Sequence, residues 1–215
     1  MGKFVDNIPD ELLVINTGNE PFEKMSKPLW HTHFLKNTSH GDAVNAAFEL
    51  VKTRYMLLVD SDVLILKDFK KPFEKFKEHG FALMGEVVGD RGGKSLYPRV
   101  NPWFCFIDLE QLKKHEIKFY DHYRTKVLKS DKIYDIGSTM FEDVINAGLS
   151  IGDAKMEGKY FKHYEGMSWR VQKYDPDNGD TDIDVGGTHD NKALYLHGLM
   201  VRQQYEQDIK NYDLY

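Results

Sequence analysis

The sequence contains a single cysteine, no long apolar run and no surplus of basic residues, although it has 215 residues in all. The lone Cys105 cannot form a disulfide within the chain, and no metal-binding cysteine motif surrounds it. It lies in the run Trp103–Ile107 (WFCFI), which is typical of a buried strand, so we predict a packing role for the thiol rather than a nucleophilic one. Free thiols are typical of a reducing compartment, and we expect the protein in the cytoplasm.

Neither a membrane nor a nucleic acid is indicated as a partner. No run approaches the ~18 apolar residues that a membrane-spanning helix needs. The 29 basic and 34 acidic residues give a formal charge of 29 − 34 = −5, whereas binding to a phosphate backbone needs a clustered basic surface. We therefore expect no transmembrane segment and no nucleic-acid partner.

The apolar content is sufficient for a folded core. Hydrophobic residues make up 41% of the chain and aromatic residues 13%, which argues against disorder. We expect residues 1–215 to form a single domain, which could be one module of a longer polypeptide. The one low-complexity stretch, 174–191, is rich in Asp, Asn and Gly, and we predict a mobile loop there.

Apolar runs and amphipathic helices alternate along most of the chain. The helix that we predict over 42–53 carries Val44, Ala47, Phe48 and Val51 at the spacing of one helical face. Strands are predicted at 12–15, 55–59, 81–88 and 103–107, and further helices at 72–79 and from 139 to Gly148. This alternation predicts an α/β domain whose central sheet is mostly parallel and flanked by helices.

Three polar residues fit the pattern of helix N-caps. Asp42 is the candidate cap of the first predicted helix. Asp108, with Gln111 three residues later, resembles a capping box that opens a short helix. Thr139 and Glu142 form a complete capping box, in which the Glu side chain folds back to the cap amide.

Two aspartates, Asp60 and Asp62, directly follow the apolar run 55–59. Because side chains alternate between the faces of a strand, these two would point the same way and repel each other unless a cation lay beside them. The carboxyl end of a strand in an open α/β sheet is also where ligands bind. Oxygen ligands suit Mg²⁺ or Mn²⁺, with positions left for a diphosphate. The alternative is a surface turn that holds two Asp residues by chance.

Four segments occur in an order that resembles the GT-A glycosyltransferases, those of family 2 in particular. They are 39–48 (SHGDAVNAAF), 55–62 (YMLLVDSD), 141–148 (FEDVINAG) and 161–168 (FKHYEGMS). They are similar to the family's Gly/Asn-rich segment and helix, its Asp-x-Asp strand, its Glu-Asp helix and its His-x-x-Gly-x-Ser region. The resemblance implies a GT-A fold with a Rossmann-like sheet.

The resemblance also implies residues that bind the metal and the donor. Asp62 would ligate an Mn²⁺ or Mg²⁺ ion that bridges the donor diphosphate, and Asp60 would contact the ribose or the metal. His163 would complete the metal site, with His197 as the alternative. Asn16 stands where the family usually has an Asp that reads the nucleotide base, and an amide offers both a donor and an acceptor to a uracil edge.

Three further residues are candidates for substrate contacts. The guanidinium of Arg91 could screen the donor phosphates, although a solvated loop charge is the simpler interpretation. The rings of Trp103 and Trp169 could stack on an acceptor sugar, although packing alone explains a Trp as well.

Sugar transfer needs a base that accepts the proton of the attacking hydroxyl. Of the two neighbouring carboxylates, Glu142 is expected to be engaged in the capping box. We therefore predict Asp143 as the base, since a carboxylate near a helix N-terminus stays ionised.

These observations lead us to expect a metal-dependent glycosyltransferase. It would move a hexose from a nucleotide-sugar donor, expected to be UDP-linked, to a hydroxyl of a glycan or glycoconjugate acceptor, with inversion. Two alternatives stay open. One is a HAD-type phosphohydrolase, for which Leu64 is atypical because that family has Thr or Val there. The other is a non-catalytic module that binds a nucleotide sugar or a carbohydrate.

Overall fold

The computed structural model describes residues 12–17, 30–35, 38–89, 97–119, 134, 136–167, 174–177, 179–180 and 191–211. Contacts between residues divide the chain into two compact units. The sheet unit comprises Ile8–Val59 and Phe69–Met156, and the α5 unit comprises Met1–Asn7, Asp60–Asp68 and Glu157–Tyr215. The single domain that we expect over 1–215 stays a prediction.

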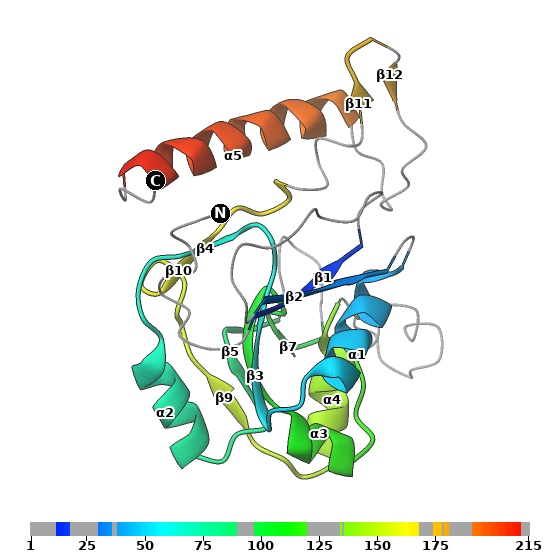
Figure 1. The fold of residues 1–215 in the computed structure, drawn as a ribbon, viewed down its shortest axis with the longest axis vertical. Helices are drawn as coiled ribbons and strands as arrows, with labels where there is room; N and C mark the ends of the chain where they lie inside the picture. Colours follow the sequence, from blue (N-terminus) through cyan, green and yellow to red (C-terminus); the bar gives the residue numbers. More distant parts are fainter. Residues whose placement is uncertain are drawn as a thin grey trace. The chain divides into compact units, whose positions relative to one another are not determined.

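A four-stranded sheet organises the sheet unit (Figure 1). Its strands are, in spatial order, β3 (Tyr55–Val59), β8 (Phe104–Asp108), β5 (Leu83–Gly85) and β9 (Ile151–Asp153). β5 and β9 are parallel, whereas β8 runs antiparallel to both β3 and β5. Three of the four strands therefore share one direction, as predicted, and β8 is the reversed exception.

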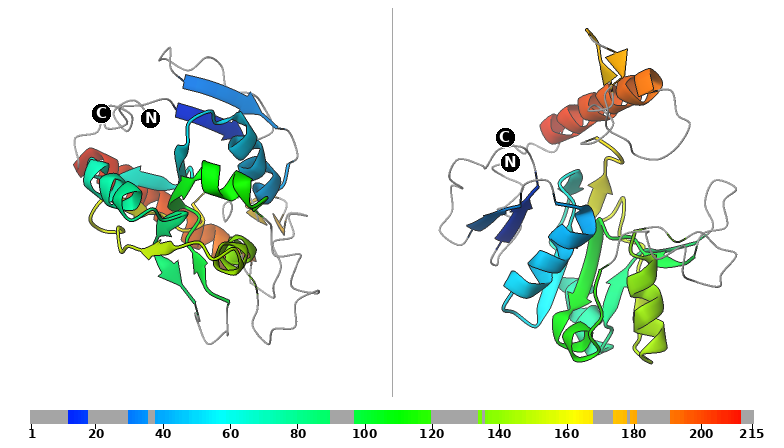
Figure 2. Two further views of the ribbon diagram at one scale, coloured as in Figure 1. Left: turned by 90° about the horizontal axis from the view of Figure 1, so that it is seen from below. Right: turned by 90° about the vertical axis from the view of Figure 1, so that its right-hand side faces the viewer.

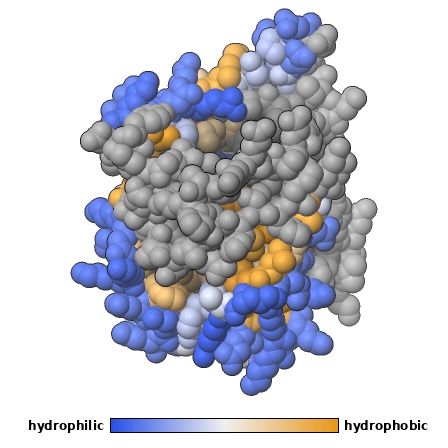
Figure 3. Space-filling view, viewed as in Figure 1, coloured by the Kyte–Doolittle hydropathy of each residue, from blue (hydrophilic) through white to orange (hydrophobic). Residues whose placement is uncertain are grey.

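Helices cover both faces of this sheet (Figures 1 and 2). On one side lies α2 (Lys70–Glu78). On the other lie α1 (His40–Leu50), α3 (Leu109–Lys114) and α4 (Ser138–Asn146). Figure 3 shows hydrophilic side chains over the outer surface of α2, as expected of an amphipathic helix with one face on a sheet. The α/β architecture with flanking helices is confirmed.

The side chains of β8 alternate between these two faces, as strand geometry requires. Cys105 and Ile107 belong to the hydrophobic cluster shared with α1, α3 and α4. Phe106 points the other way and stacks on Phe73 and Phe76 of α2, with ring centroids 5.7 Å apart in both cases. The sheet is thus covered by a mixed cluster of aliphatic, aromatic and sulfur-containing residues on one face and mainly by phenylalanines on the other.

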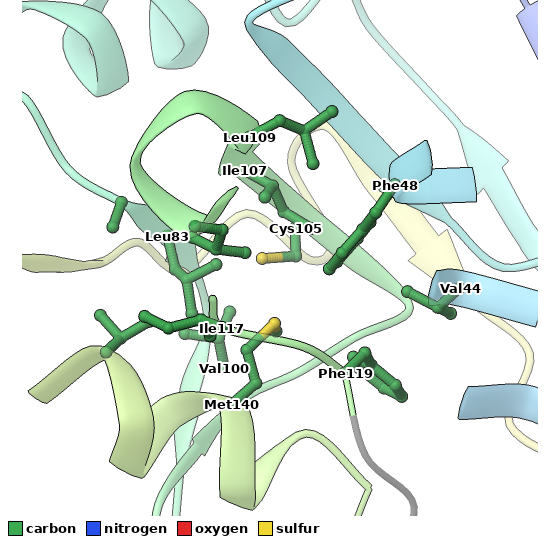
Figure 4. Packing of buried hydrophobic residues seen from close by; sticks show 13 residues of the cluster. Val44, Phe48, Leu83, Val100, Cys105, Ile107, Leu109, Ile117, Phe119 and Met140 are labelled. Carbon is green, nitrogen blue, oxygen red and sulfur yellow. The ribbon is translucent and has the colours of Figure 1, made fainter. Parts of the chain in front are cut away.

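Figure 4 shows the first of these clusters from close by. Phe48 of α1, Met140 of α4 and Cys105 of β8 all lie in this cluster, and all are buried. The predicted packing role of Cys105 is confirmed by this position, with its thiol enclosed by apolar neighbours.

The sheet unit contains two further pairs of strands. The pair β1 (Leu12–Asn16) and β2 (Trp30–Phe34) is parallel, with Leu12 opposite Trp30. The pair β6 (Val87–Val88) and β7 (Arg99–Val100) is antiparallel. β1 confirms the strand predicted at 12–15 and extends it by one residue.

Two of the three predicted caps are wrong. α1 is capped by Ser39, whose Oγ accepts a hydrogen bond from the backbone N–H of Asp42 at 3.1 Å, so Asp42 lies inside the first turn. α4 begins one residue before Thr139, at a cap formed by Gly137 with φ of 85°. Asp108 does cap α3, since its Oδ1 accepts from the N–H groups of the second and third helical residues.

The α5 unit consists of short strands and one long helix. β4 (Val63–Ile65) and β10 (Phe161–His163) pair antiparallel, and β11 (Tyr174–Asp175) pairs with β12 (Gly179–Asp180). The first part of the predicted loop 174–191 is therefore a hairpin, and its mobility stays a prediction. The helix is α5 (Asn191–Asn211). Among the helices of the described ranges, none is both long and apolar enough to cross a bilayer.

Candidate active site

Asp60 and Asp62 directly follow β3, as predicted, but they lie in a turn rather than in the strand. The backbone N–H of Val63 donates to the carbonyl of Asp60 at 3.3 Å and closes this turn. Ser61 at its tip is exposed, Asp60 is half-buried and Asp62 is buried. The argument from strand alternation is therefore wrong for this pair. The position of Asp62 is set instead by its contacts with other parts of the chain.

The contacts of Asp62 come from a distant part of the sequence. The antiparallel register pairs His163 with Val63, so the end of β10 lies against the start of β4. Just beyond, the backbone N–H of Tyr164 donates to the carbonyl of Asp62 at 2.9 Å. These backbone bonds bring His163 Nε2 to 3.4 Å from Asp62 Oδ1.

The Asp62–His163 pair is almost completely shielded from water. Its side chains are 8% and 9% exposed. Burial of a carboxylate is costly unless a positive charge or donor compensates it. An imidazole beside it satisfies that need, and so would a metal ion held between the two groups.

The residues present fit two protein ligands of a hard divalent ion. Mg²⁺ typically takes one or two carboxylates and completes its shell with water and substrate phosphates. Asp62 supplies a carboxylate oxygen, which suits both Mg²⁺ and Mn²⁺, whereas the ring nitrogen of His163 suits transition metals, so the pair fits Mn²⁺ better than Mg²⁺. Within the described ranges, no group of three or more His, Cys, Asp or Glu residues surrounds a common point. A metal here would therefore depend on a bound substrate for several of its ligands.

His163 is also held through its backbone. Its N–H donates to Oε1 of Glu157 at 3.4 Å, and Glu157 forms a bridge with Phe161. The alternative ligand His197 lies on α5 with an exposed side chain. Of the two histidines, His163 is the one that the structure places beside Asp62.

The predicted base lies on α4, in the sheet unit. Asp143 is half-buried and is the sixth residue of the helix, so the expectation that it belongs to the helix N-terminus is wrong. Thr139, the predicted cap, is instead buried inside the first turn, and its Oγ1 has no hydrogen-bond partner in the described ranges. The dipole argument for the ionisation of Asp143 therefore does not apply.

Glu142 has a different role from the one predicted. Its Oε1 accepts a hydrogen bond from the Tyr134 hydroxyl at 2.9 Å. The Tyr134 ring stacks on Tyr97, with centroids 4.5 Å apart and planes inclined by 13°. Burial, this hydrogen bond and the nearby carboxylates, including that of Asp143, raise the pKa of Tyr134 above its ordinary value. Glu142 therefore accepts a hydrogen bond as expected, but from a tyrosine hydroxyl and not from a cap amide.

Sequence reasoning missed Tyr134 and Glu157. Tyr134 ends a charged stretch that has no helical or strand periodicity, and Glu157 lies in a turn-rich segment before β10. Neither residue can be identified from the sequence around it, because its hydrogen-bond partner is known only from the fold.

The other predicted site residues are placed only in part. Asn16 is the last residue of β1, at a strand end as expected, and its side chain lies outside the described residues. Trp103 is half-buried just before β8. Arg91 and Trp169 lie outside the described residues.

Several solved structures show a weak likeness to this chain. A crystal structure of S. aureus TarS 1–349 in complex with UDP-GlcNAc is 16% identical with a TM-score of 0.44, covering 91% of this chain and 64% of that chain. The 2-C-methyl-D-erythritol 4-phosphate cytidylyltransferase from Thermus thermophilus is 14% identical with a TM-score of 0.44, covering 89% and 82%. A putative glucose-1-phosphate thymidylyltransferase from Bacillus anthracis is 10% identical with a TM-score of 0.40, covering 62% and 59%.

This chain thus spans less than two thirds of the TarS fragment and of the thymidylyltransferase. Likenesses at this level carry no information about activity. No curated protein matches the sequence.

The sequence model of Glycosyl transferase family 2 matches residues 8–140, well over half of the chain. The match includes β1, the turn with Asp60 and Asp62, and the first residues of α4. The chain therefore belongs to glycosyl transferase family 2.

Proposed function

We propose that this protein is a metal-dependent glycosyltransferase that moves a hexose from a UDP-sugar to a hydroxyl of a glycan or glycoconjugate acceptor, with inversion. Family membership supports glycosyl transfer. The observation that carries the metal-dependent part is the buried contact of 3.4 Å between Asp62 Oδ1 and His163 Nε2. Family membership also favours this function over the phosphohydrolase alternative.

Asp62 and His163 would hold the ion, and Asp60, in the same turn, would contact the ribose or complete the shell. An ion held by these residues would offset the negative charge that develops on the departing diphosphate. The shielding of the pair from water strengthens this effect, since electrostatic interactions are stronger where solvent is excluded.

Asp143 would accept the proton of the attacking acceptor hydroxyl as the oxygen bonds to the anomeric carbon. Attack by the acceptor on the side opposite the diphosphate gives inversion. The neighbouring Glu142 accepts a hydrogen bond from the Tyr134 hydroxyl, and Asp143 is the proposed base.

The remaining candidates would bind the substrates. Asn16 at the end of β1 would read the uracil edge, and Arg91 would neutralise donor phosphate charge. Trp103 and Trp169 would offer ring faces to the acceptor sugar.

A thermal-shift panel tests the donor and the metal together. UDP, GDP, dTDP and CMP are each added to the wild type with and without Mn²⁺. A ligand that binds only the native state raises Tm by mass action, so we expect stabilisation by UDP that depends on Mn²⁺. The matched variant Asp62→Asn keeps the size of the side chain and should lose the Mn²⁺-dependent part. A flat panel for the wild type would contradict the proposal.

Catalysis is separated from simple binding by Asp143→Asn. We expect UDP with Mn²⁺ to stabilise this variant as it does the wild type, while transfer from a UDP-sugar falls by about 10²–10⁴-fold, the usual contribution of a general base. Unchanged transfer would remove Asp143 from the mechanism. A wild type that binds UDP-sugars but turns none of them over would indicate the non-catalytic module instead.

A further inference from the structure

A buried carboxylate on α5 collects three hydrogen bonds. Asp208 is 8% exposed. Its Oδ2 accepts from Lys162 Nζ at 2.5 Å and from the Tyr164 hydroxyl at 2.6 Å, and its Oδ1 accepts from Gln204 Nε2 at 2.9 Å. Both oxygens are therefore engaged. The three bonds form a polar network, and such networks restrict the groups that form them.

Two of the three donors are the sequence neighbours of His163 on either side. Neighbouring side chains along an extended segment point to opposite sides. Lys162 and Tyr164 accordingly reach Asp208, while the His163 imidazole reaches Asp62. The segment that carries His163 is thus held on one side by α5 and on the other by the turn of Asp62.

We propose that Asp208 is a positioning residue for the metal site, holding His163 in place through Lys162 and Tyr164. The proposal rests on the proposed function, because it assumes that His163 is a metal ligand. Asp208 itself contacts neither the metal nor a substrate. Its role is to limit the freedom of β10 so that the imidazole meets Asp62 before any ion binds.

The anchoring of α5 supports this assignment over a simple surface contact. Gly198 and Asp208 are the buried residues of this helix, so Asp208 is its buried polar anchor. Tyr205, one turn earlier, meets the Tyr164 ring edge-to-face with centroids 5.1 Å apart. The C-terminal half of α5 thus contacts Tyr164, the residue that directly follows His163.

Removal of the charge of Asp208 should weaken metal binding more than it destabilises the fold. Outer groups that orient metal ligands typically contribute 10–100-fold to metal affinity. For Asp208→Asn we expect the Mn²⁺ concentration that gives half of the UDP-dependent Tm shift to rise by about tenfold or more. Asp208→Glu, which keeps the charge, should recover part of that loss.

A matched control lies on the same helix. Gln207 is exposed and bonds to Asn211, so Gln207→Ala removes a helix-surface hydrogen bond without touching β10. We expect its Mn²⁺ dependence to equal that of the wild type. Equal losses in Gln207→Ala and Asp208→Asn would indicate a general effect on α5 and overturn the proposal.

A second readout needs no metal. Backbone amide hydrogen exchange over 161–164 should be faster in metal-free Asp208→Asn than in the metal-free wild type, because the segment loses its restraint. If Asp208→Asn does not fold, Tyr164→Phe keeps the ring against Tyr205 and removes only the hydroxyl. We expect about a threefold or greater loss of Mn²⁺ affinity there.

The two proposals fail in different ways. A wild type without any Mn²⁺-dependent response to UDP contradicts the proposed function. A wild type with that response, together with Asp208→Asn or Tyr164→Phe variants of unchanged Mn²⁺ affinity and unchanged exchange, contradicts only the role of Asp208.

Discussion

Asp62 and His163 are separated by 101 positions in the sequence, yet two short strands bring their side chains to 3.4 Å. The residue types could be predicted from the sequence, because two aspartates after an apolar run and a later histidine fit the order of family motifs. Their contact could not, since it depends on the register between β4 and β10. A shift of that register by one residue would turn His163 to the other side.

The buried thiol gives a prediction for a single residue. Burial raises the pKa of Cys105 to about 12, so the reactive thiolate is scarce at pH 8. We expect the native protein to react with a thiol reagent such as DTNB only as fast as it unfolds, and the urea-unfolded chain to react at once. A native thiol that reacts rapidly at pH 8 would show that Cys105 is not enclosed in the core.

At the scale of elements, the strands and helices with strong periodicity could be predicted, and two features could not. The reversal of β8 has no sequence signal, because a strand with all five residues buried reads alike in either direction. α5 is not predicted as a helix, since Gly198 interrupts its pattern and its apolar residues form no single continuous face.

The caps show how close a wrong prediction can lie to the correct one. Thr139 and Glu142 have the right types and spacing for a capping box, but Gly137 adopts the left-handed conformation and caps α4 two residues before Thr139. A local pattern cannot reveal where the chain enters a helix when a glycine supplies the entry.

The cap of α3 gives a prediction about acid stability. Burial favours the neutral form of Asp108, but hydrogen bonds from Arg54 and Gln111 outweigh it and lower the pKa of Asp108 below its ordinary value. A lowered native pKa stabilises the fold above the unfolded-state pKa, near 4, and this contribution is lost as pH falls through the native pKa. We therefore expect Asp108→Asn to destabilise the protein most above about pH 4, and progressively less below it.

Urea unfolding of the wild type and Asp108→Asn at several pH values between 3 and 7 measures this difference. Glu78→Gln, a change at an exposed position of α2, serves as the control and should follow the wild type throughout. A difference between wild type and Asp108→Asn that stays constant over this range would contradict the assignment.

At the scale of the whole molecule, the fold class and the family could be predicted because the strand and helix order and the motif order agree. The division into two compact units could not be predicted. The chain leaves the sheet unit at Asp60 and returns to it at Phe69 without any change in composition. The match to the family model over residues 8–140 supports the predicted family.

The aromatic face of the sheet is predicted to be essential for stability. Phe106 is 1% exposed and stacks on two phenylalanines of α2. Truncation of a buried Phe to Ala typically costs about 3–5 kcal/mol, a large share of the 5–15 kcal/mol of a typical protein. We expect Phe106→Ala to lose roughly that much free energy of unfolding in urea titrations followed by circular dichroism.

Leu50→Ala is the matched control, because Leu50 at the end of α1 is 37% exposed. Its loss should be roughly 0.5 kcal/mol or less, as for surface substitutions in general. Equal losses in the two variants would mean that the stacking between β8 and α2 contributes little.

The most direct test of the account is a crystal of the protein grown with UDP and Mn²⁺, with anomalous scattering used to locate manganese. The account predicts one strong peak within bonding distance of both a carboxylate oxygen of Asp62 and Nε2 of His163, with UDP phosphate oxygens on its open side. A manganese peak at His197 instead, or UDP bound without any metal beside Asp62, would contradict it.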